Sequence, residues 1–288
     1  MNVGDFFTGE SAPGMIDWAS MPTYNTIMAI AAGVGLILVG RLLVHLRSAV
    51  SAGAVGAGAA ASTADAPGAT AAAHAAAAHA AGADAAGTDA DKAVILDGYT
   101  LGFFVTGLIQ TLTGLHMSLT WPLAAGGFPF DNIIFGETCL GFGVLLLAAS
   151  FILWKRGDRI LASATPFNTF ARIARPVSIF ALAMGLALLA IMCAGMVYQF
   201  FAAPPQEPIS GSFAAYPWLE SIALSAVFGL AGVGAILFFA AVRPDARGQV
   251  RGGVVSAAYW CLVISGVIFM LFGAMNFYTH IGLVVNTM

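Results

Sequence analysis

The side chains in this sequence that could perform chemistry are two histidines and two glutamates near the ends of apolar stretches: His116, His280, Glu137 and Glu220. Imidazole and carboxylate groups together bind zinc, iron, manganese or copper, and two histidines at one depth could ligate a b-type haem. All four are therefore candidate metal ligands, and His116 and His280 are candidate haem ligands. A structural polar cluster or a proton path would use the same residue types, so both alternatives stay open.

His116 belongs to a polar stripe on the apolar stretch 101–121. The stripe recurs at spacings of three and four residues and comprises Thr106, Gln110, Thr113, His116, Met117 and Thr120. Such spacings place side chains on one helix face, and because a polar face is costly in lipid we expect it to face a helix bundle. Glu137 begins the next apolar stretch at a similar depth, after a short loop. Consecutive helices usually lie side by side, so the sequence predicts that His116 and Glu137 are neighbours.

Six apolar helices must position these residues. Hydrophobic residues make up 59% of the 288-residue chain and charged residues only 9%, whereas soluble domains carry about 25% charged residues. About 20 apolar residues in a helix are needed to cross a hydrocarbon core roughly 30 Å thick. Stretches of about that length lie at 21–47, 101–121, 134–154, 177–200, 219–241 and 254–275. The sequence thus predicts an all-α fold, a polytopic membrane bundle of six transmembrane helices.

The charges predict the orientation and the domain limits. With the N-terminus outside, the inner loops receive all 11 Lys and Arg residues, as the cytoplasmic side of a membrane protein requires. Both termini are then outside. We expect an outer tail at 1–20, an Ala/Gly-rich cytoplasmic linker at 48–95 and a five-helix membrane domain at 96–288. Alanine buries little surface, so the linker is predicted to be mobile. The whole pattern of spans and charges is typical of a multi-pass protein of a prokaryotic inner membrane.

Small residues recur within these stretches at spacings typical of helix contacts. Gly107 and Gly114 lie seven residues apart, and so do Gly266 and Gly273. In membranes, small residues at such spacings let two helix backbones approach closely. The sequence therefore predicts close helix pairs along these stretches.

The composition excludes one function class and narrows the others. A net charge of −3 offers no basic surface for nucleic acid. The sequence carries no nucleophile motif and no phosphate-binding glycine loop, so an enzyme would have to act on a small molecule in the outer leaflet. We expect a metal- or haem-binding subunit of a membrane oxidoreductase, with copper, iron, zinc or a b-type haem as cofactor. A non-catalytic assembly subunit and a proton or small-ion conductor are the alternatives. The expected partners are the lipid bilayer and other membrane subunits or a second copy of the chain.

One segment of the sequence resembles a known family. The segment NIIFGETCLGFG from Asn132 to Gly143, preceded by Gly114-Leu-His116-Met117, resembles an uncharacterised prokaryotic membrane family, domain-of-unknown-function family 981. The resemblance covers roughly residues 97–285 and leaves out the first span and the linker. It implies that the Glu137 region belongs to a recurring membrane module and that the first span is an appended element. It implies no catalytic role for any residue.

Overall fold

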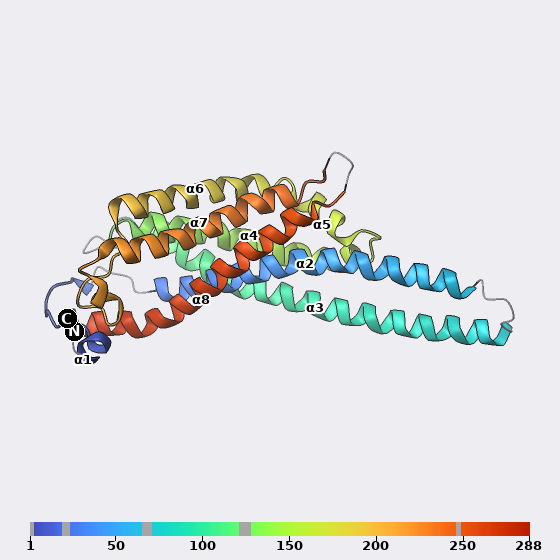
Figure 1. Cartoon of the computed structure of the whole chain (residues 1–288), viewed down its shortest axis with the longest axis horizontal. Helices are drawn as coiled ribbons and strands as arrows, with labels where there is room; N and C mark the ends of the chain where they lie inside the picture. Colours follow the sequence, from blue (N-terminus) through green and yellow to red (C-terminus); the bar gives the residue numbers. More distant parts are fainter. Residues whose placement is uncertain (1–2, 19–23, 65–70, 121–127, 246–248) are drawn as a thin grey trace.

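The computed structural model describes residues 3–18, 24–64, 71–120, 128–245 and 249–288, and these residues form helices and no strand. Eight α-helices, one π-helix and one short 3-10 helix follow one another along the described chain (Figure 1). In chain order they are α1 (Val3–Thr8), α2 (Asn25–Ala64), α3 (Ala71–Leu119), η2 (Asn132–Glu137), α4 (Thr138–Leu161), α5 (Pro166–Ala174), α6 (Ser178–Tyr198), η3 (Ser210–Phe213), α7 (Pro217–Ala241) and α8 (Gly252–Thr287). The predicted all-α fold is confirmed.

Six of these helices contain segments long and apolar enough to cross a membrane. The segments are Asn25–Ala49, Val94–Leu119, Asn132–Leu161, Ser178–Tyr198, Pro217–Ala241 and Gly252–Thr287. They correspond one by one to the six predicted spans, and the last one continues well past residue 275 to Thr287. The protein is therefore a multi-pass membrane protein whose outer helix surfaces contact the lipid bilayer.

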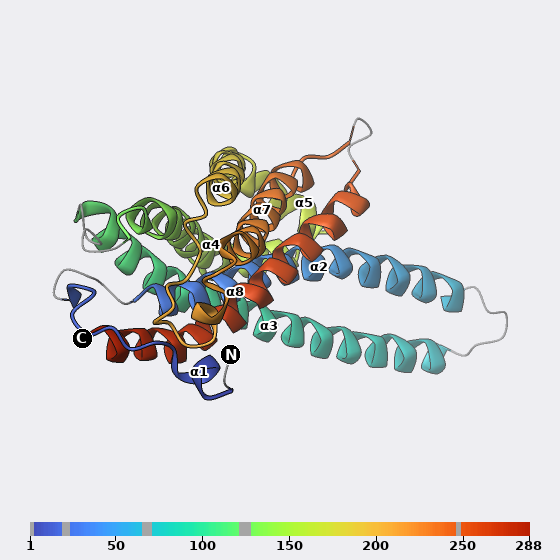
Figure 2. The same ribbon diagram turned by 60° about the vertical axis from the view of Figure 1, so that its left-hand side comes forward.

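Two of the helices extend beyond their apolar segments. α2 continues to Ala64 and α3 begins at Ala71, and the two run side by side away from the other helices (Figures 1 and 2). The linker predicted at 48–95 is helical in its described residues, and its mobility stays a prediction. Alanine has the highest intrinsic helix propensity, and this local preference explains the extension of both helices.

The bundle is assembled from close helix pairs. α3 packs along α4, α2 along α8, and α6 along α7. Glycines permit the closest approaches. A Cβ on Gly266 would lie 2.6 Å from the carbonyl oxygen of Gly33, and a Cβ on Gly114 would lie 2.8 Å from that of Gly136. The close helix contacts predicted at Gly114 and Gly266 are therefore confirmed.

Both chain termini lie at the same end of the bundle, next to α1 (Figure 1). Residues 3–18 are held there by hydrogen bonds to later parts of the chain. The Ile209 backbone N–H donates to the Phe6 carbonyl over 2.8 Å, and the Tyr278 hydroxyl donates to the Phe7 carbonyl over 2.9 Å. The N-terminal segment thus covers part of this end of the bundle.

Arginines join the helices at the opposite end. Arg47 donates to the Gly252 carbonyl over 3.0 Å, where α8 begins. Arg243 donates to the Ser178 hydroxyl over 2.8 Å and lies over the ring of Phe239, with 3.5 Å from its Cζ to the ring centroid. Arg47 and Arg243, which the sequence assigned to the inner side, therefore both lie at this end, away from both termini.

Candidate functional site

An apolar cavity of about 270 Å³ lies inside the bundle. α4 and α6 touch each other only slightly, and the space between them forms part of this cavity. Each of the five helices α2, α4, α6, α7 and α8 contributes an apolar wall, for example Met28, Phe142, Ala181, Phe228 and Phe269. The cavity interior is therefore suited to a hydrocarbon chain or ring.

One polar side chain from α3 lies in the wall of this cavity. Gln110 is 0% exposed, and neither its amide nitrogen nor its amide oxygen has a hydrogen-bond partner among the described residues. A buried polar group without a partner costs about 1–3 kcal/mol. The amide therefore has an unused donor and an unused acceptor beside the cavity.

A second cavity of about 130 Å³ adjoins the first at the end where the termini lie; we call it the mouth. The two cavities have wall residues in common, which are Asn25, Phe135, Phe201, Leu224, Phe272 and Asn276. Three carboxylates and one imidazole line the mouth: Asp131, Glu207, Glu220 and His280. The apolar cavity and the mouth, which carries the ionisable groups, are thus direct neighbours.

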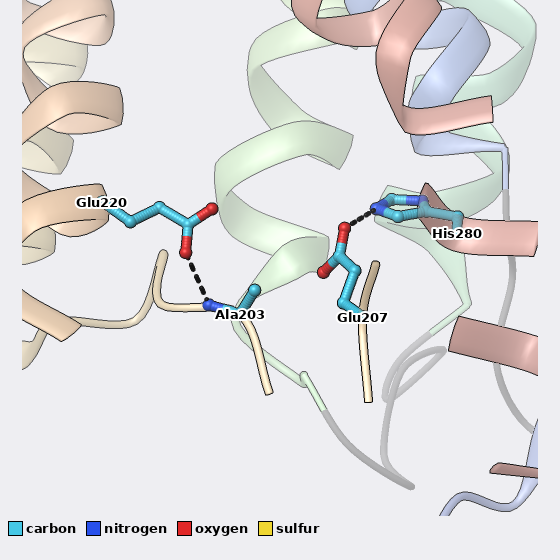
Figure 3. A network of polar contacts seen from close by, with 4 residues as sticks. All are labelled: Ala203, Glu207, Glu220 and His280. Atoms are coloured by element: carbon cyan, nitrogen blue, oxygen red, sulfur yellow. Dashed lines mark hydrogen bonds and ion pairs between the residues drawn. The ribbon is translucent and has the colours of Figure 1, made fainter. Parts of the chain in front are cut away.

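Three structural elements bring Glu220, Glu207 and His280 to the mouth (Figure 3). Glu220 from the first turn of α7 accepts a hydrogen bond from the Ala203 backbone N–H over 2.8 Å. Glu207 comes from the loop between α6 and α7, and its Oε1 lies 3.8 Å from Nε2 of His280 on α8. Figure 3 shows Glu207 between the other two side chains, so one carboxylate faces both an imidazole and a second carboxylate.

The loop that carries Glu207 is folded back onto the bundle. The Glu207 backbone N–H donates to the Pro204 carbonyl over 3.0 Å, which closes a tight turn. A Cβ on Gly282 would overlap the ring of Pro208, so the glycine allows the loop to pack directly on α8. Glu207 is only 8% exposed as a result.

Burial changes the titration of the carboxyl groups in the loops at the mouth. Burial raises the pKa of Glu207 to about 7; the nearby Thr279 hydroxyl opposes this change, and the neighbouring Glu220 carboxylate adds to it. Burial also raises the pKa of Asp131 to about 7. Both carboxyl groups therefore gain or lose a proton near neutral pH, and a bound cation would favour their ionised form.

The predicted pair of His116 and Glu137 is not formed. Nδ1 of His116 lies 2.7 Å from the hydroxyl of Tyr24, at the start of α2. Glu137 is exposed, and no described residue hydrogen-bonds or pairs with its carboxylate. The two helices are adjacent as predicted, but no described hydrogen bond or ion pair joins the two side chains.

Helix geometry explains why His116 lies outside the bundle. Gln110 is fully buried and Met117 is 1% exposed, so the inner part of the predicted stripe does face the bundle. Each residue rotates a helix by about 100°, and Met117 takes the buried position next to His116. His116 is consequently exposed, and it lines neither cavity.

The four predicted ligands are divided between different surroundings. His280 and Glu220 line the mouth, His116 contacts Tyr24, and Glu137 is exposed. Within the described ranges, no three His, Cys, Asp or Glu side chains are grouped closely enough to hold a metal ion. His116 and His280 also have different partners, so the described contacts give no support to a haem held between them.

Sequence reasoning missed two residues of the mouth. Glu207 and Asp131 were not among the predicted site residues, yet both line the mouth. For Glu207, the flanking Pro204, Pro205 and Pro208 were a signal, because prolines restrict a loop to few conformations. For Asp131, the single flanking Pro129 was a weaker signal of the same kind.

The fold and the two cavities define the class of this molecule as a polytopic helical membrane protein with an internal apolar cavity and an acidic mouth. The chain belongs to the DUF981 family, described as "Protein of unknown function (DUF981)", whose family model matches residues 21–282. The resemblance seen in the sequence is thus confirmed. The match begins earlier than residue 97, so the first span is part of the family domain and is not an appended element.

Two further comparisons gave no relatives. No curated protein matches the chain. No solved structure matches it either.

Proposed function

We propose that this protein binds an amphiphilic, lipid-soluble small molecule inside its helix bundle. The apolar part of the ligand occupies the cavity of about 270 Å³, and its polar head lies in the mouth. The observation that carries the proposal is the adjacency of the two cavities, which share the wall residues Asn25, Phe135 and Asn276. Ligand sites in proteins are typically concave and mostly apolar, with a few polar groups that orient the ligand.

The unpartnered polar atoms of the cavity support this function. Gln110 has an unpartnered amide beside the apolar cavity, and Asn276 has an unpartnered Oδ1 where the two cavities share a wall. A protein interior normally pairs such atoms, since leaving them unpaired costs stability. A ligand with polar groups at these levels would supply the missing partners.

The orientation that we propose places the mouth on the outer side of the membrane. The arginines that join the opposite end of the bundle support a cytoplasmic location for that end. A reporter enzyme that is active only outside the cytoplasm, fused after Met288, tests this orientation. Activity is expected, and an inactive but folded fusion would reverse the orientation.

The metal- or haem-binding oxidoreductase subunit remains an expectation from the sequence alone. The ligand geometry described above does not support it, so the proposed function includes no metal and no electron transfer. The mouth and cavity would serve a carrier, a receptor or an enzyme subunit equally well. We therefore limit the proposal to ligand binding.

A matched pair of substitutions on α7 tests the proposal. Ala235 lines the cavity, whereas Val233 lies two residues away on the exposed surface of the same helix. The purified protein in phosphatidylcholine nanodiscs should bind radiolabelled hexadecanol saturably, at about one molecule per chain. Ala235→Phe should abolish this binding because the ring fills the cavity, and Val233→Phe should retain it. Non-saturable uptake, or equal binding by both variants, would refute the proposal.

A further inference from the structure

We infer that the mouth selects amphiphiles whose polar head is an ammonium group. This inference rests on the proposed ligand-binding function and specifies the chemistry of the ligand head. Four features of the mouth carry it: the acceptor character of its polar atoms, the scarcity of basic side chains, its aromatic walls, and the spacing of its carboxylates.

The polar atoms that face the mouth are mainly hydrogen-bond acceptors. Asp131, Glu207 and Glu220 contribute carboxylate oxygens. Asn276 is 6% exposed, and its Oδ1 has no partner among the described residues. Oδ1 of Asn25 also has no partner among the described residues. A ligand head with several N–H donors and a positive charge would satisfy acceptors of this kind.

Basic side chains are almost absent from the walls of the mouth. Among the described residues, His280 is the only basic side chain that lines it, and Glu207 already faces that imidazole at 3.8 Å. A carboxylate or phosphate head would meet three acidic side chains without a lysine or arginine to neutralise it. Like charges at close range disfavour binding, so the mouth discriminates against anionic amphiphiles.

Aromatic rings form much of the remaining wall. Phe128, Phe130, Phe200 and Phe201 line the mouth together with Trp18. The rings contact one another, with 5.0 Å between the centroids of Phe130 and Phe200 and 4.7 Å between those of Phe200 and Phe201. Aromatic faces attract cations, and walls of aromatic and acidic groups are typical of ammonium recognition.

The spacing of the carboxylates favours an organic cation over a metal ion. Asp131, Glu207 and Glu220 surround a space of about 130 Å³, yet no three potential ligands in the described chain converge within metal-binding reach. That space is well above the roughly 30 Å³ that one water occupies in the liquid. A substituted ammonium group can bridge carboxylates that a bare divalent ion cannot reach together.

Three probes of equal chain length separate the head from the tail. Hexadecylamine, hexadecanol and hexadecanoic acid are titrated against the protein in neutral phosphatidylcholine nanodiscs at about pH 8, where amines are charged and carboxylates ionised. We expect the amine to bind about tenfold more tightly than the alcohol, which corresponds to about 1.4 kcal/mol, and the acid to bind more weakly than both. Glu207→Gln and Glu220→Gln should reduce the advantage of the amine over the alcohol to less than about threefold.

Glu10→Gln provides the matched control, because Glu10 is an exposed carboxylate at the same end of the bundle and does not line the mouth. This variant should keep the full preference for the amine, and it corrects for partition of the charged probe into the membrane. Alcohol binding without a preference for the amine would overturn the ammonium inference and leave the proposed function intact. An amine preference that survives both mouth variants would overturn it equally. Failure of all three probes to bind would refute the proposed function itself.

Discussion

The hydroxyl of Tyr24 lies 2.7 Å from Nδ1 of His116, so the start of α2 is joined to the end of α3. The rings also contact each other, with 5.8 Å between their centroids. The histidine that the sequence assigned to a metal or haem site thus has a structural partner from another helix. The ionisable groups that surround a cavity lie instead around Glu207.

The bond between Tyr24 and His116 predicts a measurable coupling. Tyr24→Phe and His116→Leu should each destabilise the protein, and the double variant should cost less than the sum of the two. We expect a coupling free energy of about 0.5–1 kcal/mol, typical of one partly exposed hydrogen bond. Reversible unfolding in mixed micelles measures it. Additive effects would show that the two side chains do not stabilise each other.

One substitution at two glycines of α8 should have opposite effects. Gly266→Ala places a Cβ 2.6 Å from the backbone oxygen of Gly33, so α2 and α8 must separate; we expect a loss of about 1–3 kcal/mol. At Gly253, a Cβ would meet no atom within 4 Å, and Gly253→Ala should stabilise the helix by up to about 1 kcal/mol. Thermal unfolding in detergent compares them. A neutral effect of Gly266→Ala would contradict the close contact.

Stability should fall as the pH rises from about 4.5 to about 7. Burial raises the pKa of Glu207 from the ordinary 4.5 to about 7, so folding favours the protonated carboxyl. This contribution is complete below pH 4.5 and is lost as the pH passes the folded-state pKa. At about 1.4 kcal/mol per pH unit, the loss is at most about 3 kcal/mol. The unfolding free energy measured from pH 4 to 8 should show this decline.

Variants assign the pH dependence to its source. Glu207→Gln should remove most of the decline, and part should remain because burial also raises the pKa of Asp131 to about 7. Glu220 and His280 face Glu207 from α7 and α8, so each is replaced in turn by Gln to measure its influence. Glu10→Gln, on the exposed N-terminal segment, should leave the profile unchanged. An unaltered profile in Glu207→Gln would assign the decline to other groups.

Gln110 should reduce the stability of the empty protein. Its amide is fully buried without a described partner, and leucine has a similar volume without polar atoms. Gln110→Leu should therefore raise the unfolding free energy of the ligand-free protein by about 1–3 kcal/mol. Chemical denaturation after delipidation measures this gain. A loss of stability would mean that the amide has a partner, such as an ordered water, in the native protein.

The six spans could be predicted because their signal is local. A run of about 20 apolar residues has few alternatives to a transmembrane helix, whatever the rest of the chain does. Glycine spacing likewise predicted the close contacts at Gly114 and Gly266, since only a residue without a side chain permits such an approach. The alanine-rich segment was harder to predict because low burial favours a mobile chain while the helix propensity of alanine favours a helix.

The candidate site depended on information that no local pattern contains. Depth along a helix placed His116 and Glu137 at one level, but depth does not define rotation, and one residue of difference turns a side chain by about 100°. Met117 took the buried position, and the π-helix η2 ends with Glu137 exposed. The sequence by itself determined the solvent, the number of spans and the inventory of polar groups. Only the tertiary structure decided which of them meet, because the loop carrying Glu207 had to fold back onto α8 to bring its carboxylate to His280.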